Sequence, residues 1–169
     1  MDYLFLTLRI VHILAGLFWV GGTLMMTFFI APTVGALGEA GPRFVAHLVR
    51  NLKFTTRMSI AAGLTALAGI WLYWIDSNGF EAPWMMSSVG TGFGIGSAFG
   101  AIGFIFGILI GRTTNALVQL GGQIQGKPTP EQFAQLQLLQ RRQAAYSKIT
   151  AVSLILAVIF MAAARFLVF

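Results

Sequence analysis

Four long apolar stretches constrain the fold of this 169-residue chain more than any other feature. They run from about Tyr3 to Ala31, Met58 to Ile75, Val89 to Ile110 and Ile149 to Phe169. Each approaches or exceeds the roughly 20 residues that a helix needs to cross about 30 Å of hydrocarbon. Helix is the expected structure, because unpaired backbone groups are not tolerated there. The sequence therefore predicts an all-α integral membrane protein: an antiparallel four-helix bundle forming one domain, residues 1–169.

The composition excludes other classes of protein. Hydrophobic residues make up 57% of the chain and charged residues 9%, whereas a soluble domain carries roughly 25% charged residues. A soluble globular protein and a disordered chain are both excluded. The chain has no cysteine, which excludes disulfide scaffolds, thiolate metal sites and cysteine nucleophiles. We expect membrane lipids, not nucleic acid, to surround its surface.

The first apolar stretch differs from a cleaved signal peptide. It is far longer than the roughly 7–15 apolar residues of a signal core. Asp2, not a basic run, precedes it. We therefore expect this stretch to remain as a helix.

The basic residues predict the orientation. They gather in two connections, after the first stretch (Arg43, Arg50, Lys53 and Arg57) and around the connection after the third (Arg112, Lys127, Arg141, Arg142 and Lys148). The connection between the second and third stretches carries Asp76 and Glu81 and no Lys or Arg. The positive-inside rule then places both basic connections in the cytoplasm and both termini outside, in the inner membrane. Aromatic residues flank the acidic connection and are typical of an outer aromatic belt: Trp71, Tyr73, Trp74 and Trp84.

Helical spacing continues beyond the apolar stretches on the cytoplasmic side. Pro42 and Pro130 suit helix starts, and Thr129 is the expected N-cap of the fourth helix. We predict that the second and fourth helices begin in the cytoplasm and run continuously into the bilayer. The third helix is expected to continue to Gly121 and Gly122.

One face of the first helix carries the residues of greatest chemical interest. Their spacing of 3, 4, 3, 4 and 3 places them in one stripe: Arg9, His12, Gly16, Trp19, Thr23 and Met26. An ionisable residue that faces lipid is energetically costly, so this stripe should face the bundle interior. Leu6, Ile10 and Leu14 lie on the other faces.

His12 is the expected centre of a cofactor site. The hydrocarbon disfavours the charged imidazole, and a neutral imidazole is a good ligand for haem iron or copper. On the fourth helix, Met161 and Arg165 should reach about the depths of His12 and Arg9, which makes Met161 a candidate second axial ligand. Glycine leaves room for a planar ring, and the arginines suit haem propionates. The predicted haem b site comprises His12, Arg9, Gly16, Trp19, Met161 and Arg165, with His12 and Met161 on the metal.

Other interpretations of this stripe remain open. Copper is the alternative metal. In a purely structural interpretation, His12 donates to a hydroxyl or carbonyl across the bundle, and both arginines extend towards the surface. The second histidine, His47, cannot share one iron with His12. If the first two helices form a hairpin, His12 lies level with Ala61, about 20 Å along the axis from His47.

Glycine is concentrated in the third helix. Gly96 and Gly100, and then Gly103, Gly107 and Gly111, repeat at every fourth position. This spacing favours close packing between helices; the alternative is a flat wall against a macrocycle or quinone. It also predicts self-association into a homo-oligomer.

Residues 8–22 resemble several small bacterial membrane families. The segments Leu8-Arg9-Ile10-Val11-His12-Ile13-Leu14 and Phe18-Trp19-Val20-Gly21-Gly22 resemble the membrane domain of copper-resistance D proteins and the HemJ-type protoporphyrinogen oxidases. The resemblance implies a bundle that handles tetrapyrrole or copper, centred on His12. The chain departs from the HemJ pattern, since it lacks the Arg and His expected after Trp19 and the Lys and His expected near Trp84.

These features lead to one main hypothesis and three alternatives. The main one is a cytochrome b-like membrane protein that exchanges electrons with a quinone pool or a redox partner protein. The alternatives are a HemJ-like oxidase, a copper transport or resistance protein, and an accessory subunit of a membrane complex.

Overall fold

The computed structural model describes residues 3–167, and all regular elements within that range are helices. Four helices are long and apolar enough to cross a membrane: Tyr3–Ala36, Phe54–Asp76, Ser88–Gln123 and Pro130–Phe166. The all-α class and the four predicted spans are confirmed. Asp2 and the last two residues of the fourth stretch, Val168 and Phe169, lie outside the described residues.

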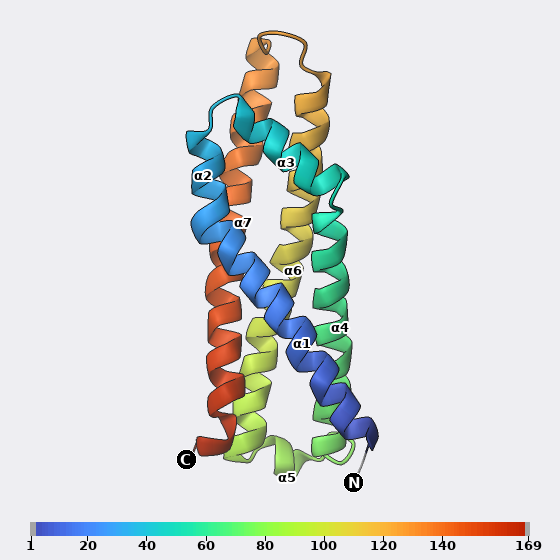
Figure 1. Ribbon diagram of the computed structural model, residues 1–169. Coiled ribbons are helices and arrows are strands. Elements are labelled where there is room, and N and C mark those ends of the chain that lie inside the picture. The colour runs from blue at the N-terminus through green and yellow to red at the C-terminus, as the bar shows by residue number, and fades with distance from the viewer. Residues whose placement is uncertain (1–2, 168–169) are drawn as a thin grey trace.

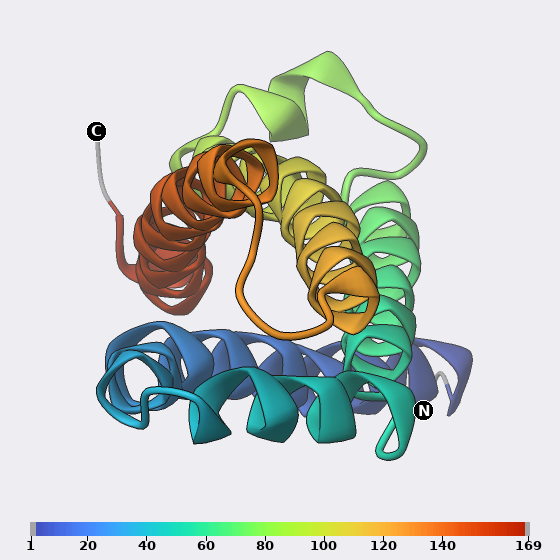
Figure 2. The same cartoon turned by 90° about the horizontal axis from the view of Figure 1, so that it is seen from above.

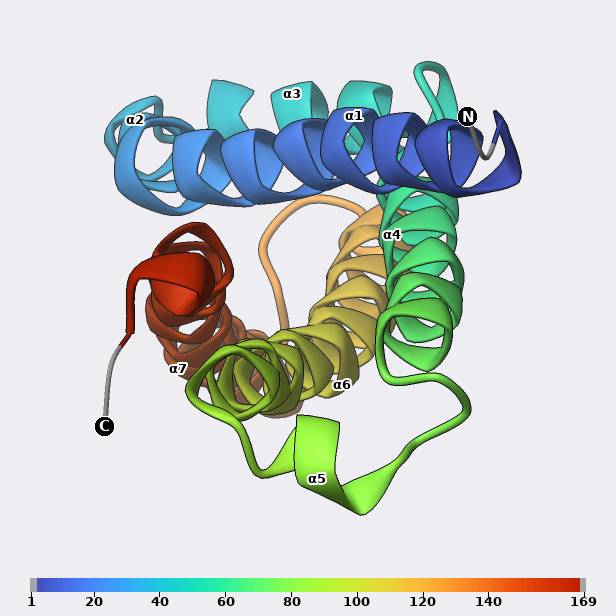
Figure 3. The same ribbon diagram turned by 90° about the horizontal axis from the view of Figure 1, so that it is seen from below.

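The long helices form a ring in the order α1, α4, α6, α7 (Figure 3). The elements are α1 (Tyr3–Met25), η1 (Met26–Ile30), α2 (Ala31–Ala36), α3 (Ala40–Arg50), α4 (Phe54–Asp76), α5 (Ala82–Met85), α6 (Ser88–Gln123), α7 (Pro130–Ala163) and η2 (Ala164–Phe166). Consecutive long helices run in opposite directions, and α1 crosses the others obliquely (Figure 1). Helices α6 and α7 pack together most extensively, followed by α1 and α4. Helix α1 runs from α4 at its start towards α7 at its end (Figures 1 and 3).

The first long helix contains one turn of π-helix, η1. The Ala31 N–H donates to the carbonyl of Met26, five residues earlier. Pro32 follows directly and has no N–H to donate, and a proline ring clashes with the carbonyl four residues before it in a regular α-helix. The wide turn accommodates the proline without ending the helix. Such π turns are frequent at functional sites.

The predicted continuous second helix is wrong. Helix α3 ends at Arg50, the N–H groups of Asn51 and Leu52 both donate to the carbonyl of His47, and Lys53 has a left-handed φ of 51° before α4 begins. Figure 2 shows α3 running from α2 to α4 along the same side of the bundle as α1. There it turns an apolar face inward, which a straight extension of α4 could not do. Arg50 fixes it by donating from Nη2 to the carbonyl of Val118 at 3.1 Å.

The predicted extensions of the third and fourth helices are confirmed as continuous helices. Helix α6 runs to Gln123, and α7 runs unbroken from Pro130. Thr129 caps α7 as predicted: its Oγ1 accepts from the Gln132 N–H at 3.2 Å, and Gln132 Oε1 accepts from the Thr129 N–H at 3.0 Å. This reciprocal pair is a capping box.

The glycines of α6 have two different roles. A Cβ at Gly96 would lie 3.1 Å from Met161 Cγ, and one at Gly103 would lie 2.7 Å from Leu154 Cδ2. These two glycines let α6 approach α7 closely, as the spacing favoured. A Cβ at Gly100 or Gly107 would meet nothing within 4 Å. Only some glycines of the repeat are therefore required for close packing between helices.

We predict that Gly103→Ala destabilises the α6–α7 pair by about 1–3 kcal/mol, because overpacking forces buried side chains off their rotamers. Leu154 is 1% exposed and has nowhere to move. Gly100→Ala on the same helix is the control and should not reduce stability. Unfolding in sodium dodecyl sulfate, followed by circular dichroism, measures both. Equal stability of the two variants would contradict this account of the packing.

Candidate functional site

The predicted stripe of α1 faces the bundle interior. Trp19 and Thr23 are 6% and 8% exposed, whereas Leu14 and Leu17 on the opposite face are 62% and 66% exposed. Spacing alone gave this orientation correctly. The stripe is shared between two separate cavities, and the first contains His12.

His12 is held against α4 by one hydrogen bond and one close approach. Its Nδ1 lies 2.8 Å from the carbonyl oxygen of Thr65. A carbonyl only accepts, so Nδ1 carries the proton and, in the neutral ring, Nε2 keeps its lone pair. A Cβ at Gly69 would lie 2.7 Å from Cε1 of the ring, so only glycine leaves room for the imidazole. The expected pairing of His12 with Ala61 is wrong, because the oblique α1 brings His12 level with Thr65 and Gly69.

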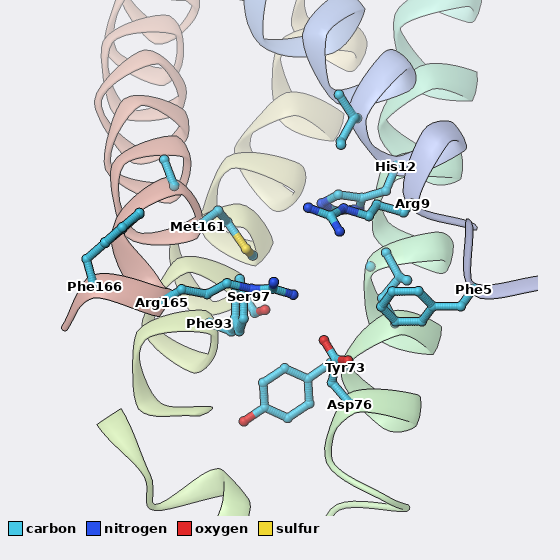
Figure 4. A pocket seen from close by; sticks show the side chains of 14 residues that line it. Phe5, Arg9, His12, Tyr73, Asp76, Phe93, Ser97, Met161, Arg165 and Phe166 are labelled. Atoms are coloured by element: carbon cyan, nitrogen blue, oxygen red, sulfur yellow. The ribbon is translucent and has the colours of Figure 1, made fainter. Parts of the chain in front are cut away.

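A cavity of about 400 Å³ opens beside the imidazole; we call it the His12 cavity. This volume lies within the range of small-molecule sites. All four long helices line it, together with η2 (Figure 4). The lining residues with reactive or charged groups are Arg9, His12, Tyr73, Asp76, Ser97, Met161 and Arg165.

Four of the six predicted site residues meet in this cavity. Arg9, His12, Met161 and Arg165 all line it. Figure 4 shows the two arginine side chains extending into the space from opposite sides, and the sulfur of Met161 pointing into it from α7. Arg9 and His12 of α1 thus lie across one cavity from Met161 of α7 and Arg165 of η2.

The other two predicted residues do not line the His12 cavity. A Cβ at Gly16 would lie 3.5 Å from Cγ2 of Thr65, so Thr65 already occupies the gap that Gly16 was expected to leave for a ring. Trp19 packs edge-on against Phe104, with ring centroids 6.2 Å apart, and lines the second cavity. The stripe reaches beyond a single site because it covers the whole inward face of a helix that crosses the bundle obliquely.

Asp76 is the site residue that sequence reasoning missed. It ends α4 and lines the His12 cavity, where it interacts electrostatically with Arg165 and Arg9. The sequence analysis assigned it to the connection between the second and third apolar stretches, because it directly follows the second. A stripe would have revealed it: Thr65, Gly69, Leu72 and Asp76 follow one another at spacings of 4, 3 and 4, on one face of a helix.

Aromatic residues border the cavity where α4 leads towards α5 and α6. The Tyr73 hydroxyl donates to the carbonyl of Gly90 at 3.2 Å. The Tyr73 ring also packs edge-on against Trp84, with centroids 5.2 Å apart, and lies against Phe80 at 6.2 Å. These contacts connect the end of α4 to the start of α6 and fix the wall that carries Asp76.

Among the lining residues of the His12 cavity, His12 and Met161 have side chains that can ligate a transition metal. The described residues include no group of three or more His, Cys, Asp or Glu side chains that could hold a metal ion. A structural zinc site requires four such ligands, and a catalytic one requires three. A haem requires one or two axial ligands and cations for its propionates. His12, Met161 and the two arginines match the second requirement.

Comparisons with known proteins identify no relative of this chain. The chain matches no protein-family model, no curated protein and no solved structure. The resemblance of residues 8–22 to copper-resistance D and HemJ-type proteins therefore stays a prediction.

We predict that Gly69→Ala displaces the His12 ring and weakens its hydrogen bond to Thr65, because the new Cβ would lie 2.9 Å from Nδ1. In protein labelled with ¹⁵N-histidine, the native ring should show a protonated Nδ1 and an unprotonated Nε2. The variant should alter this pattern. Gly63→Ala on the same helix is the control, since a Cβ there meets nothing within 4 Å. An unchanged His12 spectrum in Gly69→Ala would contradict the geometry.

Proposed function

We propose that this protein is a cytochrome b-like membrane protein that binds haem b in the His12 cavity. One observation carries the proposal. The His12 ring is fixed through Nδ1, and its other nitrogen belongs to the lining of a cavity that also holds a thioether and two guanidinium groups. These are the groups that an axially ligated, dicarboxylate macrocycle requires.

The Thr65 carbonyl prepares His12 for ligation. Histidines that ligate metals almost always donate their other ring N–H to a carbonyl or carboxylate, which fixes the tautomer and the ring orientation. The Nδ1–Thr65 contact of 2.8 Å has this form. A purely structural interpretation expected this hydrogen bond to a carbonyl, and a histidine that ligates a metal would make the same hydrogen bond. Met161, from α7, would be the second residue to hold the iron.

Arg9 and Arg165 would hold the two propionates. Both are present in the cavity with Asp76, so with a neutral imidazole the charged lining sums to +1. Asp76 interacts electrostatically with Arg165 and Arg9, whose side chains are exposed, and it would offset part of their positive charge. Phe5 and Phe93 add apolar surface to the lining, which suits the faces and edges of the macrocycle.

Electron transfer is the role that this proposal implies. A haem here supplies one-electron exchange between ferric and ferrous iron, with a quinol as the class of donor and a redox protein as acceptor. His12 and Met161 orient the group, and the apolar walls exclude water. We place the protein in the inner membrane as a homo-oligomer, with the basic connections in the cytoplasm, both termini outside and the His12 cavity towards the outer face.

Copper is the second candidate, and Met161 is the observation that favours it. Thioether and imidazole are both ligands that copper accepts, and both line this cavity. The two arginines argue for the haem, since a cation site gains nothing from two neighbouring positive charges. Metal analysis of the same purified protein separates the two candidates.

We predict a Soret band in the detergent-purified protein and its loss in His12→Ala, because the variant removes the strong axial ligand. His47→Ala is the matched control and should keep the band, since His47 is exposed on α3 and outside the cavity. Absorption spectroscopy and haem extraction measure both variants. If the wild type lacks the band, or His12→Ala keeps it at full strength, the haem proposal fails. Copper present at one equivalent and lost in His12→Ala would support the second candidate.

A second prediction concerns the opposite ligand. Met161→Leu should keep the haem but lower its reduction potential, because a methionine ligand raises the potential of haem iron. Met86→Leu is the control, since Met86 is 82% exposed and outside the cavity. Spectroelectrochemical titration measures both. A potential equal to that of the wild type in Met161→Leu would remove Met161 from the ligand set.

A further inference from the structure

A second and larger cavity, of about 730 Å³, lies elsewhere in the bundle; we call it the Trp19 cavity. It shares no lining residue with the His12 cavity. Helix α3 contributes Val45, Leu48 and Val49, and the π turn contributes Met26 and Thr27. Two features that the sequence did not predict, the separate α3 and the π turn, therefore both help to build it.

The walls of this cavity differ in chemistry. Trp19, Leu48 and Phe104 contribute apolar surface from α1, α3 and α6. Helix α7 contributes polar residues at spacings of 3, 4 and 3, which places them on one face: Gln140, Gln143, Ser147 and Thr150. Apolar walls with a few polar groups on one side are typical of small-molecule sites.

Thr150 provides an unpaired hydroxyl in this polar stripe. Its side chain is 1% exposed, and its Oγ1 has no hydrogen-bond partner. Other buried threonines satisfy themselves locally: Thr23, Thr65 and Thr113 each donate to the carbonyl four residues earlier at 2.8 Å. Thr150 makes no such bond. A buried hydroxyl left unpaired is unfavourable unless something binds to it.

Gln143 provides a second unpaired atom and limits what it can bind. Its Nε2 donates to Oγ1 of Thr114 on α6 at 2.9 Å, which fixes the amide. Its Oε1 is buried and has no partner. An amide oxygen only accepts, so a ligand must offer a donor to it. The lining contains one cation, Lys148, and no Asp or Glu. A cationic donor would therefore find no carboxylate to pair with in this cavity. A neutral hydroxyl is the donor that fits.

We propose that the Trp19 cavity binds a membrane amphiphile with an apolar body and a hydroxyl-bearing head, which donates to Gln143 Oε1 and bonds to the Thr150 hydroxyl. Two sources offer this chemistry: a glycerolipid such as a monoacylglycerol, and a prenylquinol. The proposal uses no residue of the His12 cavity. Binding here and haem binding there can therefore fail separately.

Thermal unfolding in lauryldimethylamine-N-oxide tests the proposal, because this detergent has no hydrogen-bond donor in its head group. Four probes are added to separate samples: monooleoylglycerol, methyl oleate, a decyl benzoquinol kept under argon, and the matching quinone. Saturating binding to the folded state should raise Tm by about 5 °C. We expect this from one or both hydroxyl-bearing probes, and not from methyl oleate or the quinone. The probe that acts identifies the source.

Matched valine variants keep the test decisive. Thr150→Val removes the unpaired hydroxyl at constant shape, so it should not reduce stability without a probe and should lose most of the probe-induced shift. Thr113→Val is the control, since Thr113 is buried, bonded to its own helix and outside the cavity. It should keep the full shift. Equal shifts from monooleoylglycerol and methyl oleate, no shift from either hydroxyl-bearing probe, or an undiminished shift in Thr150→Val would overturn the proposal.

Discussion

The contact between the His12 ring and α4 determines how the bundle is divided. Glycine at position 69 and the carbonyl of Thr65 hold the imidazole against α4, and from there α1 runs obliquely towards α7 along one side of the ring (Figures 1 and 3). Space remains towards both ends of the bundle. Small buried residues in the middle of α4 and α7, among them Ala68, Ala151 and Ala157, fill the region between the segments that line the two cavities.

The sequence predicted those features that depend on local pattern. The four spans, the inward face of α1 and the Thr129 cap follow from hydropathy, helical period and one N-cap motif. The features it missed depend on contacts between distant segments. The separate α3 arises because an amphipathic stretch gains more by packing its apolar face against the side of the bundle than by extending α4. The level of His12 follows from the tilt of α1, which no spacing within one helix records.

Within the candidate site, the sequence predicted which side chains come together, but it did not predict where the unoccupied volume lies. Arg9, His12, Met161 and Arg165 were assigned by type and depth, and they meet in one cavity. Gly16 was expected to leave room for a planar ring. Whether such room exists depends on the opposite helix, and Thr65 of α4 occupies it. Asp76 was overlooked because its role comes from the two arginines of other helices that it faces, not from its neighbours in the chain.

The two cavities share one structural feature, built from different side chains. In each, a side chain with two polar atoms belongs to a residue that lines the cavity and is fixed through one of those atoms. His12 is fixed through Nδ1 to Thr65, and Gln143 is fixed through Nε2 to Thr114. In hydrocarbon, a polar group without a partner costs free energy that packing alone does not recover. A purely structural bundle would use both atoms or replace the residue with an apolar one. Both proposed sites rest on this feature: Gln143 Oε1 is buried without a partner, and His12 is bonded through Nδ1.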